Sequence, residues 1–255
     1  MSENNSELGN PKWLLALGLP VLLIGGVIGW FWHDARPGSD PAAALSGGDR
    51  AAIEQVVREY ILNNPEILPE AMQNLQQREN AKQLSGIRGD VEKPFPGAVM
   101  GNPDGKVTLV EFTDYACGYC RQSVGDVERL IKDNPDLRIV VRELPILSPD
   151  SAEAARMALA AAEQGKYTAF HNAMFAAGRP SAATIDAAAK AAGLDLAKAK
   201  EAAKSDRIEA ELNRNIELAQ KLGFSGTPSW VAGDELMAGA VGADRLAEAI
   251  DNARG

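Results

Sequence analysis

The chain has 255 residues, a formal net charge of -9 and 45% hydrophobic residues, which is enough for one substantial core with appended segments. Proteins that bind nucleic acid need clustered lysine and arginine to neutralise phosphates, and the sequence contains no such cluster. We therefore expect no nucleic-acid partner, and proteins or small molecules remain as partners.

An uncharged apolar run, 13–32, follows a polar tail at 1–12. About 20 helical residues span roughly 30 Å, the thickness of a bilayer core, and the tryptophans at both ends of the run are typical of membrane interfaces. The sequence predicts a cytoplasmic tail followed by a single-pass transmembrane signal anchor at 13–32. A cleaved signal peptide is the alternative because 42–44 offers a small-residue cleavage site, although the run exceeds the usual signal core.

Residues 33–48 are rich in Pro, Gly, Ser, Asp and Ala and are predicted to form a flexible linker. Segment 49–84 is predicted to form two helices separated by 63–65. Their apolar positions have helical spacing and are Ile53, Val56, Val57, Tyr60 and Ile61 in the first helix and Leu68, Met72 and Leu75 in the second. Two such helices cannot bury their apolar faces on each other alone, so they pack either on the main domain or on other copies of the chain as an oligomerisation segment.

Residues 85–106 contain closely spaced Gly and Pro, including a strong turn signal at 102–105, and are predicted to be a linker before the main domain, 107–255. In that domain a strand from Val107, an amphipathic helix from Cys117 and a second strand, 137–144, form a parallel crossover unit. A helical block follows, with segments predicted at 150–162, 167–177, 182–192, 196–203 and 206–222. Two short strands at 229–232 and 235–237, joined by a Gly-Asp turn, and a helix at 243–253 complete the domain.

The only two cysteines have the spacing Cys117-Gly-Tyr-Cys120. Cys120 lies on the buried stripe of its helix, whereas Cys117 is expected at the exposed N-terminal end, where free backbone N–H groups and the helix dipole favour a thiolate. Cys117 is therefore expected to attack and Cys120 to resolve. The pattern does not fit zinc, which would need two further ligands, because His33 and His171 are the only histidines, and His171 is interpreted as a helix-packing residue.

The order of these elements resembles the thioredoxin fold of the DsbA family of thiol–disulfide oxidoreductases. That order is a strand, a helix that begins with C-x-x-C, a second strand, a helical block, and then Thr227-Pro228 followed by a hairpin and a last helix. Segments 143–155 and 170–175 also resemble that family. The resemblance implies an α/β thioredoxin fold with an inserted helical domain at about 148–205. Segment 52–77 is similar to the N-terminal segment of the Com1-like and ScsC-like branch, where it can drive self-association.

The resemblance also implies roles for individual residues. Cys117 would be the nucleophile and Cys120 the resolving thiol, which form a redox-active disulfide that needs no metal or other cofactor. Pro228 would be a cis proline facing the site, and Thr227 beside it would pair its backbone with substrate. Glu111 corresponds to a buried acid used in proton transfer, and strand alternation places it on a face that begins apolar.

The dipeptide Gly118-Tyr119 is expected to contact substrate, and it departs from the Pro-His of the strongest oxidases. Because Tyr119 cannot supply a cationic donor beside the sulfur, we expect a less oxidising couple. The resulting hypothesis is an oxidoreductase anchored in the inner membrane and facing the periplasm. Its partners would be cysteine-containing exported proteins and a membrane redox partner that reoxidises or reduces the pair. The alternative is a non-catalytic envelope chaperone or a protein that binds copper through the two thiols.

Overall fold

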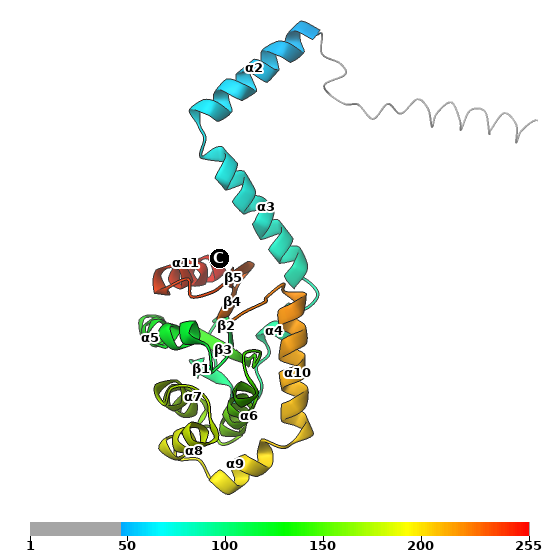
Figure 1. Ribbon diagram of the computed structural model, residues 1–255. Helices are drawn as coiled ribbons and strands as arrows, with labels where there is room; N and C mark the ends of the chain where they lie inside the picture. The colour runs from blue at the N-terminus through cyan, green and yellow to red at the C-terminus, as the bar shows by residue number, and fades with distance from the viewer. Residues whose placement is uncertain (1–46, 255) are drawn as a thin grey trace, which may run out of the picture. The chain divides into compact units, whose positions relative to one another are not determined.

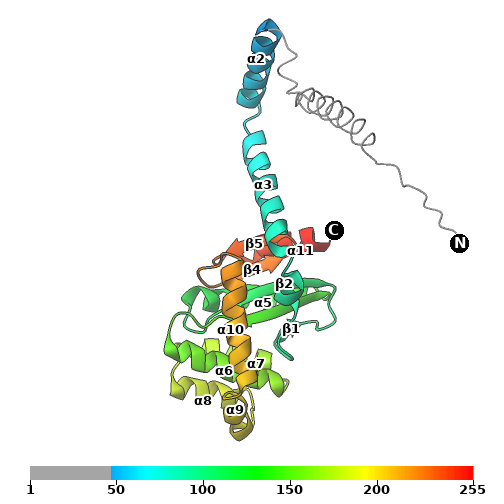
Figure 2. The same cartoon turned by 90° about the vertical axis from the view of Figure 1, so that its right-hand side faces the viewer.

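A computed structural model describes residues 47–254, and Figures 1 and 2 show their helices and strands in two views. The predicted cytoplasmic tail, the transmembrane anchor at 13–32 and nearly all of the linker at 33–48 lie outside the described residues. Across 47–254, none of the helices combines the length and the apolar character needed to span a bilayer. The chain divides into two compact units, Met1–Pro69 and Glu70–Gly255.

The described part of the first unit is mainly the helix α2 (Gly47–Asn63). Its end matches the predicted stop, since both the backbone and the side-chain nitrogen of Asn64 bond to the carbonyl of Tyr60. The large apolar side chains of α2 are exposed to solvent, and they are Ile53, Val56, Val57, Tyr60 and Leu62. Within the described part of this unit, this helix face has no partner.

The second unit is built on a five-stranded sheet in the order β1-β3-β2-β4-β5. Its strands are β1 (Val99–Gly101), β2 (Val107–Thr113), β3 (Leu137–Glu143), β4 (Ser229–Ala232) and β5 (Glu235–Ala238). The central pair β2 and β3 is parallel and the other pairs are antiparallel. The helix α5 (Gly118–Asp133) connects β2 to β3, as the sequence predicts.

Both faces of the sheet are covered, which explains why β2 and β3 are almost continuously apolar instead of alternating. On one face, Leu109, Ile139 and Trp230 pack with α5 and with α11 (Ala243–Arg254). On the other face, Val110 and Phe112 pack with the end of α3 (Ile67–Leu84), with α4 (Arg88–Glu92) and with α10 (Asp206–Lys221). Figure 1 shows α5 and α11 on one side of the sheet and α10 on the other.

A helical block lies between β3 and β4. It comprises α6 (Pro149–Glu163), α7 (Tyr167–Ala176), α8 (Ala182–Ala191) and α9 (Leu196–Ala202), which fall within the insertion predicted at about 148–205. Their facing surfaces are alanine-rich and buried, so the helices pack closely, and Tyr167 and Phe170 of α7 reach the core of the sheet domain. Figure 2 shows this block below the sheet.

The segment 85–106 is not a linker, and that prediction is corrected. It forms α4 and the edge strand β1, which pairs antiparallel with β3. Phe95, Ala98 and Met100 of this segment lie in the hydrophobic core. The turns that the glycines predict are present, since Gly97 and Gly101 have positive φ angles of 86° and 73°. A strand of three residues between two turns is too short for a periodic pattern to reveal it.

Candidate active site

Cys117 is the N-cap residue of α5, and its sulfur lies where the first turn of the helix presents free backbone N–H groups. The Cys117 Sγ accepts a hydrogen bond from the backbone N–H of Cys120 at 3.3 Å. The backbone N–H of Cys117 donates to the Asp114 carbonyl at 3.0 Å, which fixes the turn that leads from β2 into the helix. Both cysteines are free thiols. The Cys117 sulfur therefore lies at the positive end of the helix dipole, with a backbone donor beside it.

Cys117 is not exposed, which corrects the expectation from its position at the helix end. Only 5% of the residue is accessible. The Cys117 S–H donates a hydrogen bond to the carbonyl of Thr227 at 3.2 Å. Thr227 lies 110 positions further along the chain and covers the sulfur. Gly118 and Tyr119 remain exposed outside it, with Tyr119 63% accessible. Local helix geometry cannot show a cover that comes from another part of the chain.

The loop that covers Cys117 contains a cis peptide bond between Thr227 and Pro228, directly before β4. The prediction of a cis proline at the site is therefore confirmed. Pro228 is buried, and its carbonyl accepts a hydrogen bond from Gly239 N–H at 2.8 Å. The pairing of Thr227 with a substrate backbone stays a prediction.

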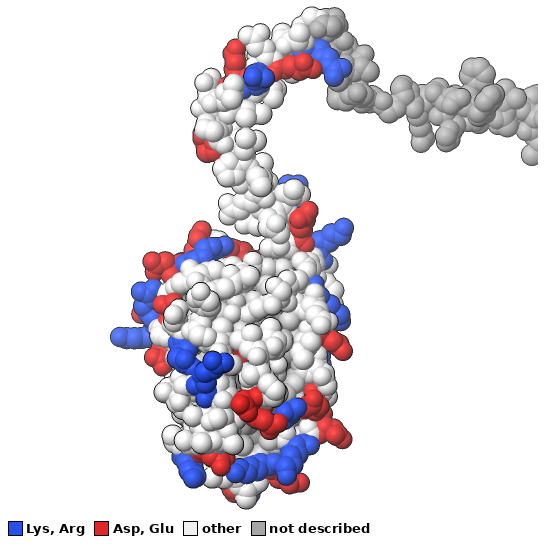
Figure 3. Space-filling model, viewed as in Figure 1, with Lys and Arg blue, Asp and Glu red and all other residues white. Residues whose placement is uncertain are grey.

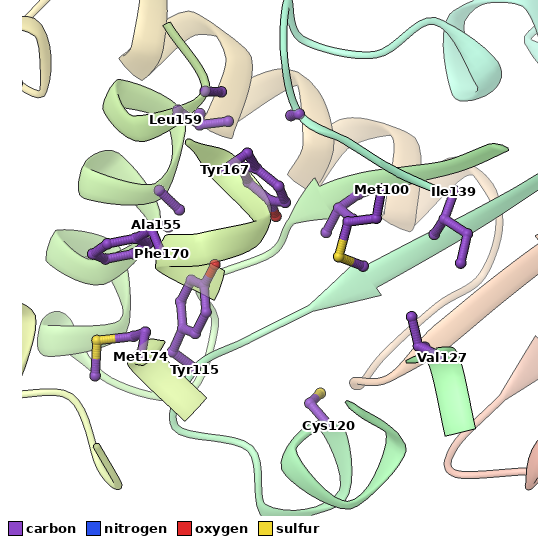
Figure 4. Close-up of a cluster of buried hydrophobic side chains, with 14 of the residues drawn as sticks. Met100, Tyr115, Cys120, Val127, Ile139, Ala155, Leu159, Tyr167, Phe170 and Met174 are labelled. Carbon is purple, nitrogen blue, oxygen red and sulfur yellow. The ribbon is translucent and has the colours of Figure 1, made fainter. Parts of the chain in front are cut away.

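Cys120 lies one helical turn further into the protein and is completely buried. Figure 4 shows it directed from α5 into the cluster of buried apolar side chains. Burial raises the pKa of the Cys120 thiol, and a negative charge on Glu111 raises it further. Cys120 is therefore a thiol at neutral pH, and a nearby base must remove its proton before it can attack.

Glu111 is a carboxyl group near Cys120, on the central strand β2. It is only 2% accessible, which confirms the predicted burial, and its strand neighbours are Val141 on β3 and Trp230 on β4. Its Oε2 has no hydrogen-bond partner. Burial in these apolar surroundings raises the pKa of Glu111 to about 8. A carboxyl group with that pKa can both accept and release a proton near neutral pH.

A second buried carboxyl group, Glu143 at the end of β3, was not singled out from the sequence. Its Oε1 accepts hydrogen bonds from the hydroxyls of Tyr115 at 2.9 Å and Tyr167 at 2.6 Å. Figure 4 shows both hydroxyl ends turned toward the same part of the interior. Burial raises the pKa of Glu143 to about 8. A glutamate in the otherwise apolar end of a strand was the sequence signal that could have identified it.

His171 of α7 is 2% accessible and packs against the rings of Tyr115, Tyr167 and Phe175. Burial lowers the pKa of His171 to about 4, so the imidazole is neutral at physiological pH. This arrangement agrees with its interpretation as a packing residue. Its Nδ1 lies 3.3 Å from the Tyr115 hydroxyl.

The rim of the site is held by Asp114. Its Oδ1 accepts the N–H of Ala116 at 2.7 Å, and its Oδ2 accepts the N–H groups of Ile146 and Leu147, each at 2.9 Å. The loop after β3 is thereby fixed against the loop that carries Cys117. Ile146, Leu147 and Tyr119 expose apolar side chains there, which sequence reasoning did not foresee for the first two. Exposed apolar side chains beside a dithiol are typical of a surface that contacts another molecule.

Within 47–254, no group of three or more His, Cys, Asp and Glu side chains is placed to hold a metal ion. The site described above defines a class of protein, namely a thioredoxin-like α/β protein with a C-x-x-C dithiol that faces a cis-proline loop. Residues 108–251 match the family of DSBA-like thioredoxin domains, and 49–82 match the copper resistance protein ScsC N-terminal domain. The chain belongs to the DsbA-like family of thiol–disulfide oxidoreductases.

Solved structures agree with this assignment. A thioredoxin-like oxidoreductase from Silicibacter pomeroyi DSS-3 is 44% identical, covers 61% of this chain and 91% of its own, and has a TM-score of 0.59. Proteus mirabilis ScsC in a transitional conformation is 29% identical over 83% of this chain and 97% of its own, with a TM-score of 0.61. A periplasmic thioredoxin-like protein from Salmonella enterica serovar Typhimurium is 28% identical over 66% and 95%, with a TM-score of 0.59.

Curated relatives include a Na(+)/H(+) antiporter NhaA 3 from Salinispora tropica, which is 31% identical over 160 residues. The match covers 61% of this chain but only 24% of the antiporter. The chain thus spans about a quarter of that relative's length, and transport is a property of the longer protein.

Proposed function

We propose that this chain is an envelope thiol–disulfide oxidoreductase that forms or rearranges disulfide bonds in exported proteins. The observation that carries the proposal is the geometry at the start of α5, where Cys117 Sγ lies between the Cys120 N–H and the Thr227 carbonyl. The two thiols are unequal in position, because Cys117 lies beneath exposed residues and Cys120 lies in the core. Family membership supports the same chemistry.

The reaction balances without a metal or an organic cofactor. When the enzyme is oxidised, a substrate thiolate attacks Cys117 Sγ, the Cys117–Cys120 disulfide breaks, and the Cys120 thiolate takes a proton from Glu111. A second thiolate of the same substrate then attacks the substrate sulfur of the mixed disulfide. The substrate leaves with a new disulfide bond, and Cys117 is released as a thiolate. In the opposite direction Glu111 accepts the Cys120 proton, Cys120 attacks Cys117 Sγ, and the substrate leaves as a thiolate.

We assign substrate contact to the exposed pair Gly118 and Tyr119 and to the backbone of Thr227 beside Pro228. A side chain added at Gly118 would meet nothing within 4 Å, so substrate can approach the backbone there. The exposed apolar side chains of Ile146 and Leu147 extend this surface. On the face drawn in Figure 3, charged side chains of both signs lie mainly around the edges of the domain, with an area free of them between. This face shows no extended patch of Lys and Arg of the kind that nucleic-acid binding requires.

The proposed location is the periplasmic side of the inner membrane, with the anchor at 13–32 holding the catalytic domain there. The apolar run in the sequence supports the anchor, and a dithiol that acts on disulfides is suited to an oxidising compartment. The relative from Salmonella is described as periplasmic. A membrane redox partner would reoxidise the pair if the enzyme forms disulfides, or reduce it if the enzyme rearranges them.

The test of this function is the recovery of a secreted protein with several cysteines, added either fully reduced or with scrambled disulfides. The purified full chain should accelerate recovery of at least one of these two forms in a glutathione buffer. No acceleration of either form would contradict the proposed function. Acceleration of the scrambled form alone would identify an isomerase, and acceleration of the reduced form alone an oxidase.

A thiol copper-binding protein is the second candidate, because 49–82 match a domain named for copper resistance and Cu(I) favours thiolates. The same recovery experiment separates the two. A copper-binding protein without exchange activity would bind Cu(I) through Cys117 and Cys120 and would leave the client unchanged.

We further propose that α2 mediates self-association. Its apolar side chains are exposed at helical spacing, as Ile53, Val56 and Tyr60 illustrate, and 49–82 match the ScsC N-terminal domain. A second copy of the same helix is the occupant that this proposal assigns to the face.

Replacing Val56 and Tyr60 together by aspartate should convert an oligomer of the full chain into a monomer, because two charges would have to be buried in the interface. Light scattering after gel filtration measures the mass. Arg58→Ala, an exposed change on the same helix, is the matched control and should leave the mass unchanged. A wild-type chain that is already monomeric at micromolar concentration would contradict the proposal.

A further inference from the structure

Two buried carboxyl groups lie on the same face of the central strands. β2 and β3 are parallel, with Glu111 opposite Val141 and Thr113 opposite Glu143. Successive residues of a strand alternate between faces, so Glu111, Thr113 and Glu143 share one face. Glu111 and Glu143 are therefore diagonal neighbours, a relation in which long side chains can reach each other.

Hydrogen bonds restrict how Glu143 can hold a proton. Its Oε1 accepts from both Tyr115 and Tyr167, and its Oε2 has no partner. A proton on Glu143 therefore belongs on Oε2. Tyr115 uses its single hydroxyl proton in the 2.9 Å hydrogen bond to Glu143. In the 3.3 Å contact between His171 Nδ1 and the Tyr115 hydroxyl, the proton is therefore on Nδ1, which donates to the tyrosine oxygen.

Three buried polar atoms follow one another on this face, and they are Glu111 Oε2, Thr113 Oγ1 and Glu143 Oε2. Thr113 lies close enough to Glu111 for a hydrogen bond between the two side chains to lower the Glu111 pKa against the larger effect of burial. Buried polar atoms of native proteins are usually paired, so a row of buried polar atoms in an apolar core calls for an explanation. The row extends from the acid beside Cys120 to the acid held by the two tyrosines. A structural role alone would be served by paired or apolar residues at these positions.

The titratable groups that face Glu143 come from three parts of the domain. They are Glu111 of β2, Asp114 and Tyr115 of the loop after β2, and Tyr167 and His171 of α7. The adjacent Arg142 extends to the opposite side, toward α4 and α10. Besides the two tyrosines, the titratable neighbours are the acids Glu111 and Asp114 and the neutral His171. Within 47–254, these groups supply no positive charge that would offset a negative charge on Glu143.

We propose that Glu143 is a positioning residue of the redox site that controls the protonation of Glu111 and thereby the removal of the proton from Cys120. This inference rests on the proposed disulfide exchange. The two acids hold at most one negative charge between them, because a charge on either disfavours a charge on the other. When Glu111 is ionised, Glu143 keeps its proton on Oε2. When Glu111 accepts the proton of Cys120, its charge disappears. Glu143 can then ionise by releasing its Oε2 proton to solvent, and the tyrosine hydroxyls stabilise the carboxylate.

The test is the pH dependence of resolution by Cys120 in Glu143→Gln. The full chain is first converted to a mixed disulfide of Cys117 with glutathione, and the release of glutathione is followed by acid quench and mass spectrometry. Gln keeps an acceptor for the two tyrosines but cannot carry charge. Glu111 then loses a like-charged neighbour, so its pKa falls. The acid limb of the rate profile should shift to lower pH by about one unit.

Two further variants distinguish control of protonation from loss of structure. Glu143→Asp keeps the charge and should retain an acid limb close to that of the wild type. Tyr167→Phe removes one donor that stabilises ionised Glu143, so the limb should shift in the same direction as in Glu143→Gln but less far. It also provides the test if Glu143→Gln does not fold. Superimposable profiles in the wild type and the charge-altering variants would overturn the inference. A wild-type chain that releases no glutathione at any pH would contradict the proposed function instead.

Discussion

Replacing Cys117 by serine should reduce client recovery to the rate of the client alone. The hydroxyl that replaces the thiol occupies the same N-cap position and can keep the bonds to Cys120 N–H and the Thr227 carbonyl. The change therefore removes the attacking sulfur with little change in packing. Because Cys120 is completely buried, it cannot take over the attack on a protein substrate. Insulin reduction or client recovery measures the loss.

The matched control is Gln122→Ala, an exposed change in the first turns of the same helix. It should keep the activity of the wild type. Full activity in Cys117→Ser would show that the C-x-x-C pair is not the site of exchange.

Replacing Arg142 by alanine should give a large loss of stability. The guanidinium is 1% accessible and ion-pairs with Glu211 at 2.6 Å. It also donates to Asn215 and to the carbonyls of Asp90, Val91 and Lys93, which attaches α4 and α10 to β3. Removing it leaves the Glu211 carboxylate, the buried carbonyl of Val91 and the partly buried carbonyls of Asp90 and Lys93 without this donor, at a cost on the order of 3–5 kcal/mol.

Urea unfolding followed by circular dichroism measures this cost. Arg138→Ala on the same strand is the control. Arg138 is partly exposed, and within 47–254 its side chain donates hydrogen bonds to the Thr108 hydroxyl alone. It should cost about 1 kcal/mol or less. Equal losses in the two variants would contradict the role assigned to Arg142.

The sequence predicts much of this fold because its signals are local and strong. The apolar runs at 107–113 and 137–143 identify the two central strands, and helical spacing on Cys120, Val127 and their neighbours identifies the buried stripe of α5. Thr227-Pro228 was placed by resemblance to a family, since the sequence alone favours a trans bond at an ordinary proline. The structure confirms the cis bond.

The rest depends on contacts between distant parts of the chain. The cover that Thr227 provides over Cys117, the edge strand β1 and the bonds from Tyr115 and Tyr167 to Glu143 all join residues far apart in sequence. Periodicity within one element cannot reveal them. It is these long-range contacts that give Cys117, Cys120 and the two acids their different chemical surroundings.

The measurement that tests the central claim most directly is the trapping of substrates by Cys120→Ser. Without the resolving thiol, a mixed disulfide between Cys117 and a client cannot be released from the enzyme side. Non-reducing electrophoresis and mass spectrometry should show the full chain joined to the client through Cys117, and the adduct should disappear with reductant and be absent when Cys117 is also replaced by serine. A Cys120→Ser chain that forms no such adduct with a client containing disulfides would contradict the assignment of Cys117 as the attacking thiol.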